Sequence, residues 1–218
     1  MNAKRAFNDG PGGGNERPAD YGIDLLWIPL GAGGWFVQFN GRVWETIQAR
    51  RERRPPDDLF HSALVVRVPE GRFTIENAWP IPGSSGKSRG VVAEGPVFSR
   101  WLGAFRIFRY EVRCWRDGVI DDAKWAVGGP RRISDRRVKA WRVLDRLPDM
   151  PSYVWGRQIP GTGDMWNSNS TISWVLTRSG IDAARIEPPP AGRAPGWQAG
   201  ISVARRQTDP DSPPQHTA

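Results

Sequence analysis

One histidine in an apolar segment is the first residue in this sequence that could do chemistry. His61 stands in the segment Phe-His-Ser-Ala-Leu-Val-Val, and the only other histidine is His216. Histidine is the side chain whose unperturbed pKa lies nearest neutrality, so His61 is a candidate general base. A strand histidine can instead be held by a neighbouring carbonyl group, and His61 taken alone favours this structural interpretation.

A short polar segment supplies the candidate nucleophile. Residues 166–171 read Trp-Asn-Ser-Asn-Ser-Thr and lead into an apolar stripe with helical spacing. Small polar side chains cap helices, and this is the structural interpretation of the segment. A helix start also suits catalysis, because its free N–H groups and dipole stabilise a developing oxyanion. If His61 reaches Ser168 Oγ, the two side chains form a nucleophile–base pair.

The two candidates lie on elements predicted from hydrophobic periodicity and turn residues. The sequence predicts strands at 23–30, 60–68, 73–79, 105–115 and 197–203, and helices at about 41–54, 134–147 and from 167 or 168 to 180. Strands with interposed helices but no regular βαβ repeat favour an α+β fold with a mainly antiparallel sheet. We expect one domain over 20–205, with disordered ends at 1–19 and 206–218.

A catalytic imidazole needs a third group to orient it. Glu76 and Asn77 lie on the predicted hairpin partner of the His61 strand. Consecutive strand residues point to opposite faces, so only one of the two can contact His61. We select Glu76, with the alternative that it is an ordinary surface carboxylate.

The order of these two blocks resembles circularly permuted papain-like hydrolases of the NlpC/PPPDE type. The PPPDE-type desumoylating isopeptidases carry a His-x-x-Val-Val strand and an Asn-Cys-Asn-Thr-Phe helix start, with Cys as nucleophile and His as base. Residues 61–66 are similar to the first block, with Leu64 in place of Val, and residues 167–170 are similar to the second, with Ser168 in place of Cys. The chain also resembles a bacterial family of unknown function with an Asn-Ser-Asn-Thr helix start.

The resemblance implies a permuted papain-like fold in which Ser168 is the nucleophile, His61 the base and the Ser168 N–H one oxyanion donor. Asn167, Asn169 and Trp166 are the candidate substrate contacts, although Trp166 is alternatively a lid on the core. Serine has a far higher pKa than cysteine, so its proton must leave during attack. Two functions stay open: a hydrolase or acyl-transferase for amide, isopeptide or ester bonds, and the favoured one, a retired enzyme that binds a protein or peptide in the remnant cleft.

The charge of the chain suggests a third function. The net charge is +8 and the pI about 10.5, which is typical of proteins that associate with nucleic acid. However, 27 of the 31 basic residues are arginine, and abundant Arg, Gly, Pro and Ala also indicate a GC-rich bacterial genome. We favour this genomic interpretation and keep nucleic-acid association as the alternative function.

Several further classes of site are disfavoured. Cys114 is the single cysteine and, by strand alternation, should face the core rather than act as a reactive thiol. One Cys and two His are too few for a structural zinc site, whereas a carboxylate-bound hard cation stays open. The Gly-rich segment 83–88 lacks the first glycine of a phosphate-binding loop, so we expect no cofactor. Without an apolar span of about 20 residues or a signal peptide, we expect a cytoplasmic location and no membrane contact.

Overall fold

The computed structural model describes residues 21–30, 57–78, 90–97, 99–105, 108–120, 122–190 and 192–207. The predicted helix at 41–54, the Gly-rich segment at 83–88 and the predicted disordered arm at 1–19 lie outside the described residues. Of the predicted tail, Arg206 ends the last helix, and the Gln207 side chain accepts a 2.6 Å hydrogen bond from Trp174 Nε1. The folded part therefore continues two residues beyond the predicted boundary at 205.

The centre of the fold is a mainly antiparallel sheet with the strand order β4-β5-β3-β2-β1-β6. Its strands are β1 (Gly22–Pro29), β2 (Asp58–Val68), β3 (Gly71–Ala78), β4 (Val91–Pro96), β5 (Arg109–Arg116) and β6 (Arg131–Ser134). The two-residue strand β9 (Gly192–Arg193) pairs with the start of β2 in parallel, and β7 (Gln158–Ile159) and β8 (Asp164–Met165) form a separate hairpin. The predicted α+β class with a mainly antiparallel sheet is confirmed.

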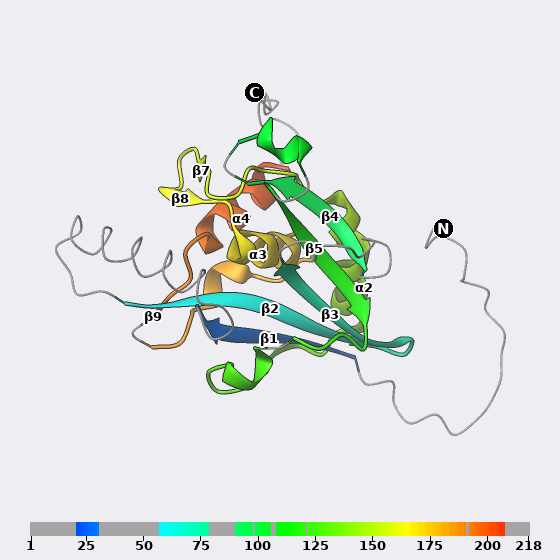
Figure 1. The fold of residues 1–218 in the computed structure, drawn as a ribbon. Coiled ribbons are helices and arrows are strands. Elements are labelled where there is room, and N and C mark those ends of the chain that lie inside the picture. Colours follow the sequence, from blue (N-terminus) through cyan, green and yellow to red (C-terminus); the bar gives the residue numbers. More distant parts are fainter. Residues whose placement is uncertain are drawn as a thin grey trace, which may run out of the picture.

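The described residues also form three α-helices: α2 (Arg137–Arg146), α3 (Ser168–Arg178) and α4 (Trp197–Arg206). Figure 1 shows α3 and α4 on one side of β1 and β2, with the short helical turn η4 (Ala123–Trp125) on the other side. Every residue of α3 from Ser168 to Leu176 is buried. A helix without an exposed stripe has protein on all sides, and α3 is accordingly the central element of the core.

The sheet has two buried faces, which we call the helix face and the second face. Strand β2 alternates between them, as its period of two requires. Phe60, Leu64 and Val66 belong to the main core with the three helices, whereas Ala63 and Val65 pack with residues of β1 and with Ile120 in a smaller cluster. The segment from 117 to 130 crosses the second face, with Thr74 Oγ1 donating a 2.7 Å hydrogen bond to Gly118 O.

The predicted strand at 197–203 is wrong, because these residues form helix α4. Trp197, Ala199, Ile201 and Val203 alternate as in a strand, but Gly200 and Ala204 are buried as well. Burial at 197, 200, 201 and 204 follows the helical period of 3.6 residues. The apolar residues between 197 and 204 therefore fit both the period of two of a strand and the period of 3.6 of a helix, and the sequence pattern does not distinguish them.

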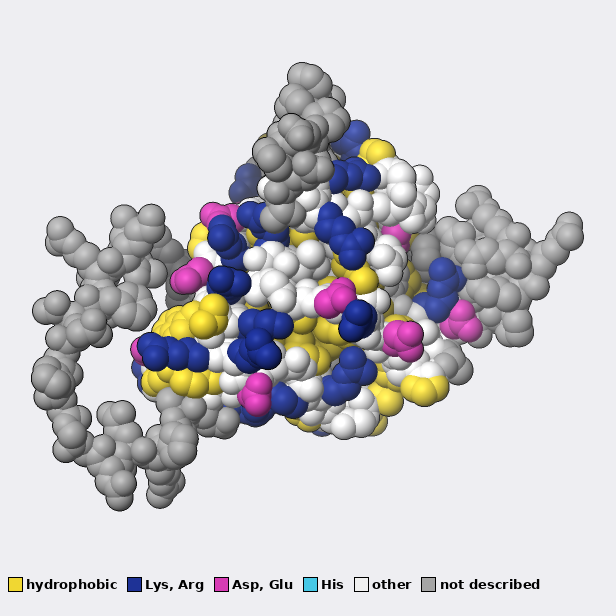
Figure 2. Space-filling model, turned by 180° about the vertical axis from the view of Figure 1, so that it is seen from behind, with side chains coloured by type: hydrophobic (Ala, Val, Ile, Leu, Met, Phe, Trp, Pro, Cys, Tyr) yellow, Lys and Arg dark blue, Asp and Glu magenta, His cyan; other side chains and the backbone are white. Residues whose placement is uncertain are grey.

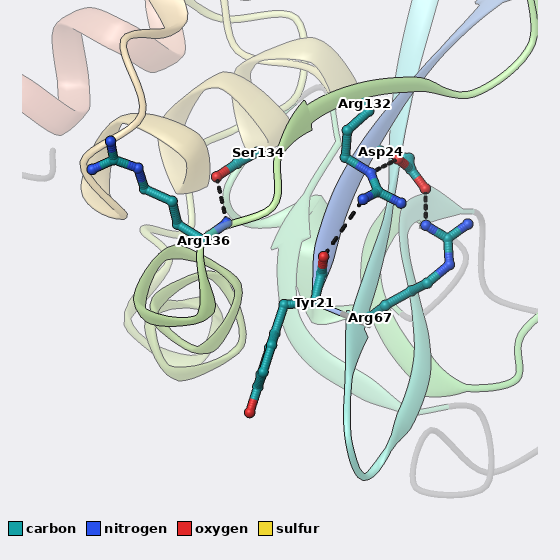
Figure 3. Close-up of polar contacts among 6 residues, drawn as sticks. All are labelled: Tyr21, Asp24, Arg67, Arg132, Ser134 and Arg136. Carbon is teal, nitrogen blue, oxygen red and sulfur yellow. Dashed lines mark hydrogen bonds and ion pairs between the residues drawn. The ribbon is translucent and has the colours of Figure 1, made fainter. Parts of the chain in front are cut away.

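The other predicted elements lie close to their predicted positions. The hairpin of β2 and β3 and the strand β1 are confirmed, and β5 occupies the second half of the predicted strand at 105–115. Ser134 ends β6 rather than directly capping α2, and its hydroxyl accepts a 3.3 Å hydrogen bond from the Arg136 N–H (Figure 3). Cys114 packs against the main core, and burial raises the pKa of its thiol to about 12, in agreement with its predicted packing role.

Candidate functional site

The start of α3 is fixed by a reciprocal cap. Asn167 is the N-cap residue, and its Oδ1 accepts hydrogen bonds from the N–H groups of Asn169 at 2.9 Å and Ser170 at 3.4 Å. In return, Ser170 Oγ accepts a 3.0 Å hydrogen bond from the Asn167 N–H. This capping box satisfies donors that a helix start otherwise leaves without partners, and it confirms the predicted helix start.

The side-chain amides of the two asparagines join three distant parts of the chain. Asn167 Nδ2 and Asn169 Nδ2 both donate 2.8 Å hydrogen bonds to Pro195 O. Asn169 Nδ2 also donates to Phe60 O at 2.9 Å, and Asn169 Oδ1 accepts from Ser62 Oγ at 2.8 Å. These bonds occupy both amides, so the prediction that Asn167 and Asn169 contact a substrate is not supported: the two side chains hold the fold together.

Helix α4 begins beside α3, and the two N-termini converge. Gly196 precedes α4 with a φ of +92°, and a Cβ atom there would lie 2.0 Å from Asn167 Oδ1. Asp164 lies opposite, and its carboxylate accepts a 2.6 Å hydrogen bond from the Gly196 N–H and a 2.9 Å bond from the Met165 N–H. Burial raises the pKa of Asp164, and these N–H donors partly offset the shift. Asp164 therefore takes up the free N–H groups at the start of α4.

Ser168 differs from its neighbours in the motif. It is the first residue of α3 and only 9% exposed. In the part of the chain that the structure describes, its hydroxyl has no hydrogen-bond partner. Its N–H group belongs to the first turn, which has no partner within the helix itself. Ser168 thus presents two hydrogen-bond donors to which the described residues offer no acceptor.

His61 lies on the opposite side of the sheet from Ser168. It pairs with Ile28 of β1, a member of the second-face cluster, whereas the adjacent Ser62 points to the helix face and contacts Asn169. Burial lowers the pKa of His61, and the carboxylate of Asp122 on the second face partly opposes this shift. The predicted pair of Ser168 and His61 is therefore not formed, because strand alternation gives the helix side of β2 to Ser62.

Glu76 shares the second face with His61, but it forms an ion pair with a residue of the neighbouring strand β5. Glu76 lies opposite Arg113 of β5, with 4.0 Å between Oε1 and Nη1. Arg113 in turn donates two hydrogen bonds, of 3.0 and 3.1 Å, to Glu111 Oε2. Glu76 belongs to this buried ionic cluster, and the structure gives it no contact with the His61–Ser168 pair that was predicted.

Asn77, the alternative to Glu76, points to the helix face. It pairs with Val112 of the main core and lies two residues beyond Ile75, the partner of Leu64. Both polar atoms of its side chain are buried, and neither has a hydrogen-bond partner among the described residues. A buried amide without partners is costly, so Asn77 is a residue whose presence packing does not explain.

Trp166 is part of the core. Its side chain is 0% exposed, its Nε1 donates a 3.0 Å hydrogen bond to Tyr110 Oη, and its ring centroid lies 5.1 Å from that of Tyr153. Tyr110 Oη continues the chain by donating to Tyr153 O at 3.0 Å. The structure therefore places Trp166 in the core, as the alternative prediction had it, and leaves none of its side chain exposed for a substrate contact.

Sequence reasoning missed Ser62, the residue whose side chain contacts the start of α3, although it stands next to His61.

Among the described residues, no group of three or more His, Cys, Asp or Glu side chains is placed to hold a metal ion. None of the described helices has the length and apolarity needed to cross a membrane. Comparisons of the chain with protein-family models, curated proteins and solved structures found no match.

Proposed function

We propose that this protein is a non-catalytic binding protein on a permuted papain-like scaffold, and that it holds a peptide segment of a partner protein at the start of α3. One observation carries the proposal. Among the described residues, neither the N–H nor the hydroxyl of Ser168 has a hydrogen-bond partner, while the imidazole that would make it a nucleophile lies on the other face of the sheet. A buried central helix on an antiparallel sheet supports the papain-like scaffold.

The argument against catalysis is that no histidine of the described residues reaches Ser168. A serine hydroxyl must lose its proton during attack, and a helix dipole cannot ionise it at neutral pH. His61 is the only histidine among the described residues, and it faces Asp122. For His61 to reach Ser168, strand β2 would have to break its pairing with β1 and β3 and exchange the residues on its two faces.

The same geometry suits binding. The Ser168 N–H and hydroxyl can both donate to one oxygen atom, such as the carbonyl or carboxylate oxygen of a peptide. Asp164 occupies the start of α4, which leaves the first turn of α3 as the donor site. Because the neighbouring asparagines and Ser170 are held in place, the two donors are preorganised and binding orders no further side chain.

The test is a binding measurement with a selected peptide. Peptides are selected from a displayed random library on the immobilised full chain, and their affinities are measured by fluorescence polarisation. Ser168→Ala should weaken binding about tenfold without a change in Tm, because one hydrogen bond to a ligand is worth about 1.4 kcal/mol. Thr177→Ala, at the other end of the same helix, is the matched control and should leave the affinity unchanged.

The alternative function, a serine hydrolase, has a separate readout. A fluorophosphonate probe should not label the wild-type chain if the proposal is right. Labelling that disappears in both Ser168→Ala and His61→Ala would show that the two side chains do meet, and the protein would then be an enzyme. Equal peptide affinity of wild type and Ser168→Ala would also overturn the proposed site.

A further inference from the structure

A basic, partly aromatic edge runs along the side of the sheet where β6 pairs with β1. Segment 131–137 contains four arginines and one acidic residue, and all four arginines are exposed. Figure 2 shows more Lys and Arg than Asp and Glu side chains on the face turned away in Figure 1. We call Lys124, Trp125, Arg131, Arg132, Arg136 and Arg137 the β6 edge.

The described residues place few carboxylates beside the cations of the β6 edge. No carboxylate of the described residues lies within ion-pair distance of Arg131, Arg136 or Arg137. Arg132 donates a 2.5 Å hydrogen bond to Asp24 Oδ1, but Asp24 also binds Arg67, as Figure 3 shows. One buried carboxylate between two guanidinium groups leaves a net positive charge at the surface.

The β6 edge also carries an exposed indole. Trp125 is 55% exposed, and the ammonium group of Lys124 lies 5.6 Å from the centroid of its ring. The pairing with β1 places these residues in order: the Val127 N–H donates to Trp27 O, and Arg131 lies beside Leu25. The chain then enters α2, so Trp125 and the cations follow one another along the backbone at this edge, with Arg131 and Arg132 on opposite faces of β6.

We propose that the β6 edge binds single-stranded nucleic acid, with arginines on the phosphates and Trp125 stacked on a base. Guanidinium groups match phosphate oxygens in a bidentate geometry, and an exposed indole stacks on any base. Neither the pairing of arginine with phosphate nor the stacking of an indole depends on which base is present, so binding should be largely independent of sequence and strongly weakened by salt. This inference does not depend on the function proposed for Ser168.

The experiment measures binding of a fluorescein-labelled oligothymidylate of about 20 nucleotides, longer than a binding site of about 4–16 nucleotides, to the full chain. Arg131→Glu/Arg136→Glu should weaken binding at least tenfold and reduce the salt slope between about 50 and 200 mM. Arg116→Glu/Arg185→Glu makes the same change of charge at exposed positions elsewhere and should change affinity less than threefold. Trp125→Ala should weaken binding of the oligonucleotide about tenfold and leave binding of duplex DNA unchanged.

Three outcomes would overturn the proposal. Equal losses in the two double variants would show a general effect of net charge rather than a site. If Trp125→Ala binds the oligonucleotide with unchanged affinity, Trp125 does not stack on a base. Binding to vesicles that contain anionic lipid, without binding to the oligonucleotide, would assign the β6 edge to a membrane surface instead. Circular dichroism of each variant confirms that it is folded.

Discussion

The Ser62 hydroxyl donates a 2.8 Å hydrogen bond to Asn169 Oδ1 and joins β2 to the first turn of α3 across 107 residues of chain. Both side chains are buried, at 1% exposure each, so neither partner can turn to water if the bond is lost. Unpaired buried polar atoms are more costly than the bond itself is stabilising. This contact is therefore a principal link between the early and late parts of the sequence.

Asn169 in α3 and Asn77 on the helix face of the sheet should respond to the same substitution in opposite ways. Asn169→Leu removes the bonds to Ser62, Phe60 and Pro195 and should lower the free energy of unfolding by about 3 kcal/mol or more. Asn77→Leu replaces an amide without partners by an apolar side chain of similar size and should raise the free energy of unfolding by about 1 kcal/mol. Urea unfolding measures both.

The control for this pair is Asn77→Asp, which buries a charge at the same position and should be destabilising. If Asn77→Leu lowers the free energy of unfolding instead, the side-chain amide of Asn77 must form a hydrogen bond in the folded protein, and the prediction is wrong.

Gly196→Ala should be among the most destabilising single-methyl additions in this chain. The residue has a φ of +92°, and the new Cβ would lie 2.0 Å from Asn167 Oδ1, which caps α3. We expect a loss of about 3 kcal/mol or more, measured by chemical unfolding. Gly128→Ala separates the two causes, because Gly128 has a φ of +70° and nothing within 4 Å of the added atom. It should cost only about 1 kcal/mol, and equal losses at the two positions would contradict the steric argument.

The pH dependence of stability should carry a signature of Asp164. Burial raises the pKa of this carboxyl in the folded protein above its ordinary value of 3.8. The folded state therefore binds the proton more tightly, and the stabilisation from Asp164 is complete below pH 3.8 and decreases as the pH rises through the folded pKa. Relative to Asp164→Asn, the wild type should lose stability over that interval. Urea unfolding of both proteins at a series of pH values tests the sign, and a rising difference would refute it.

His61 should titrate below its ordinary range. Burial lowers its pKa from 6.5, so the folded state favours the neutral imidazole. Its contribution to stability is present above pH 6.5 and is lost as the pH falls through the folded pKa. Nuclear magnetic resonance of the imidazole protons should give a pKa under 6.5, and His61→Gln should remove the corresponding loss of stability. A pKa above 6.5 would mean that the carboxylate of Asp122 outweighs burial.

The sequence predicts the cap at Asn167 and the hairpin of β2 and β3 because both signals are local. It could not tell which face of the sheet His61 occupies. Strand β2 is buried on both faces, with Phe60 and Leu64 on one and Ala63 and Val65 on the other, so its apolar residues show no alternation from which to read a phase. The prediction that His61 reaches Ser168 was therefore an assumption about long-range packing.

The other errors have similar physical causes. Small residues between 197 and 204 satisfy the period of a strand and of a helix, and only the packing of Gly200 against Ser170 and Ser173 selects the helix. The strand β6 was missed because it is four residues long and contains two arginines, which is typical of an edge strand. The bonds from Asn169 to Phe60 and Pro195 join segments that no local pattern connects.

The central position of α3 has a consequence for how the protein is made. The strands that surround this helix come from the first two thirds of the sequence, but residues 168–178 leave the ribosome late. Until then, only α2 can cover the apolar helix face of the sheet, and incomplete chains expose the rest of that face to other proteins. Synthesis of this chain should therefore be sensitive to chaperone supply and to pauses in translation ahead of that segment, more than its modest size suggests.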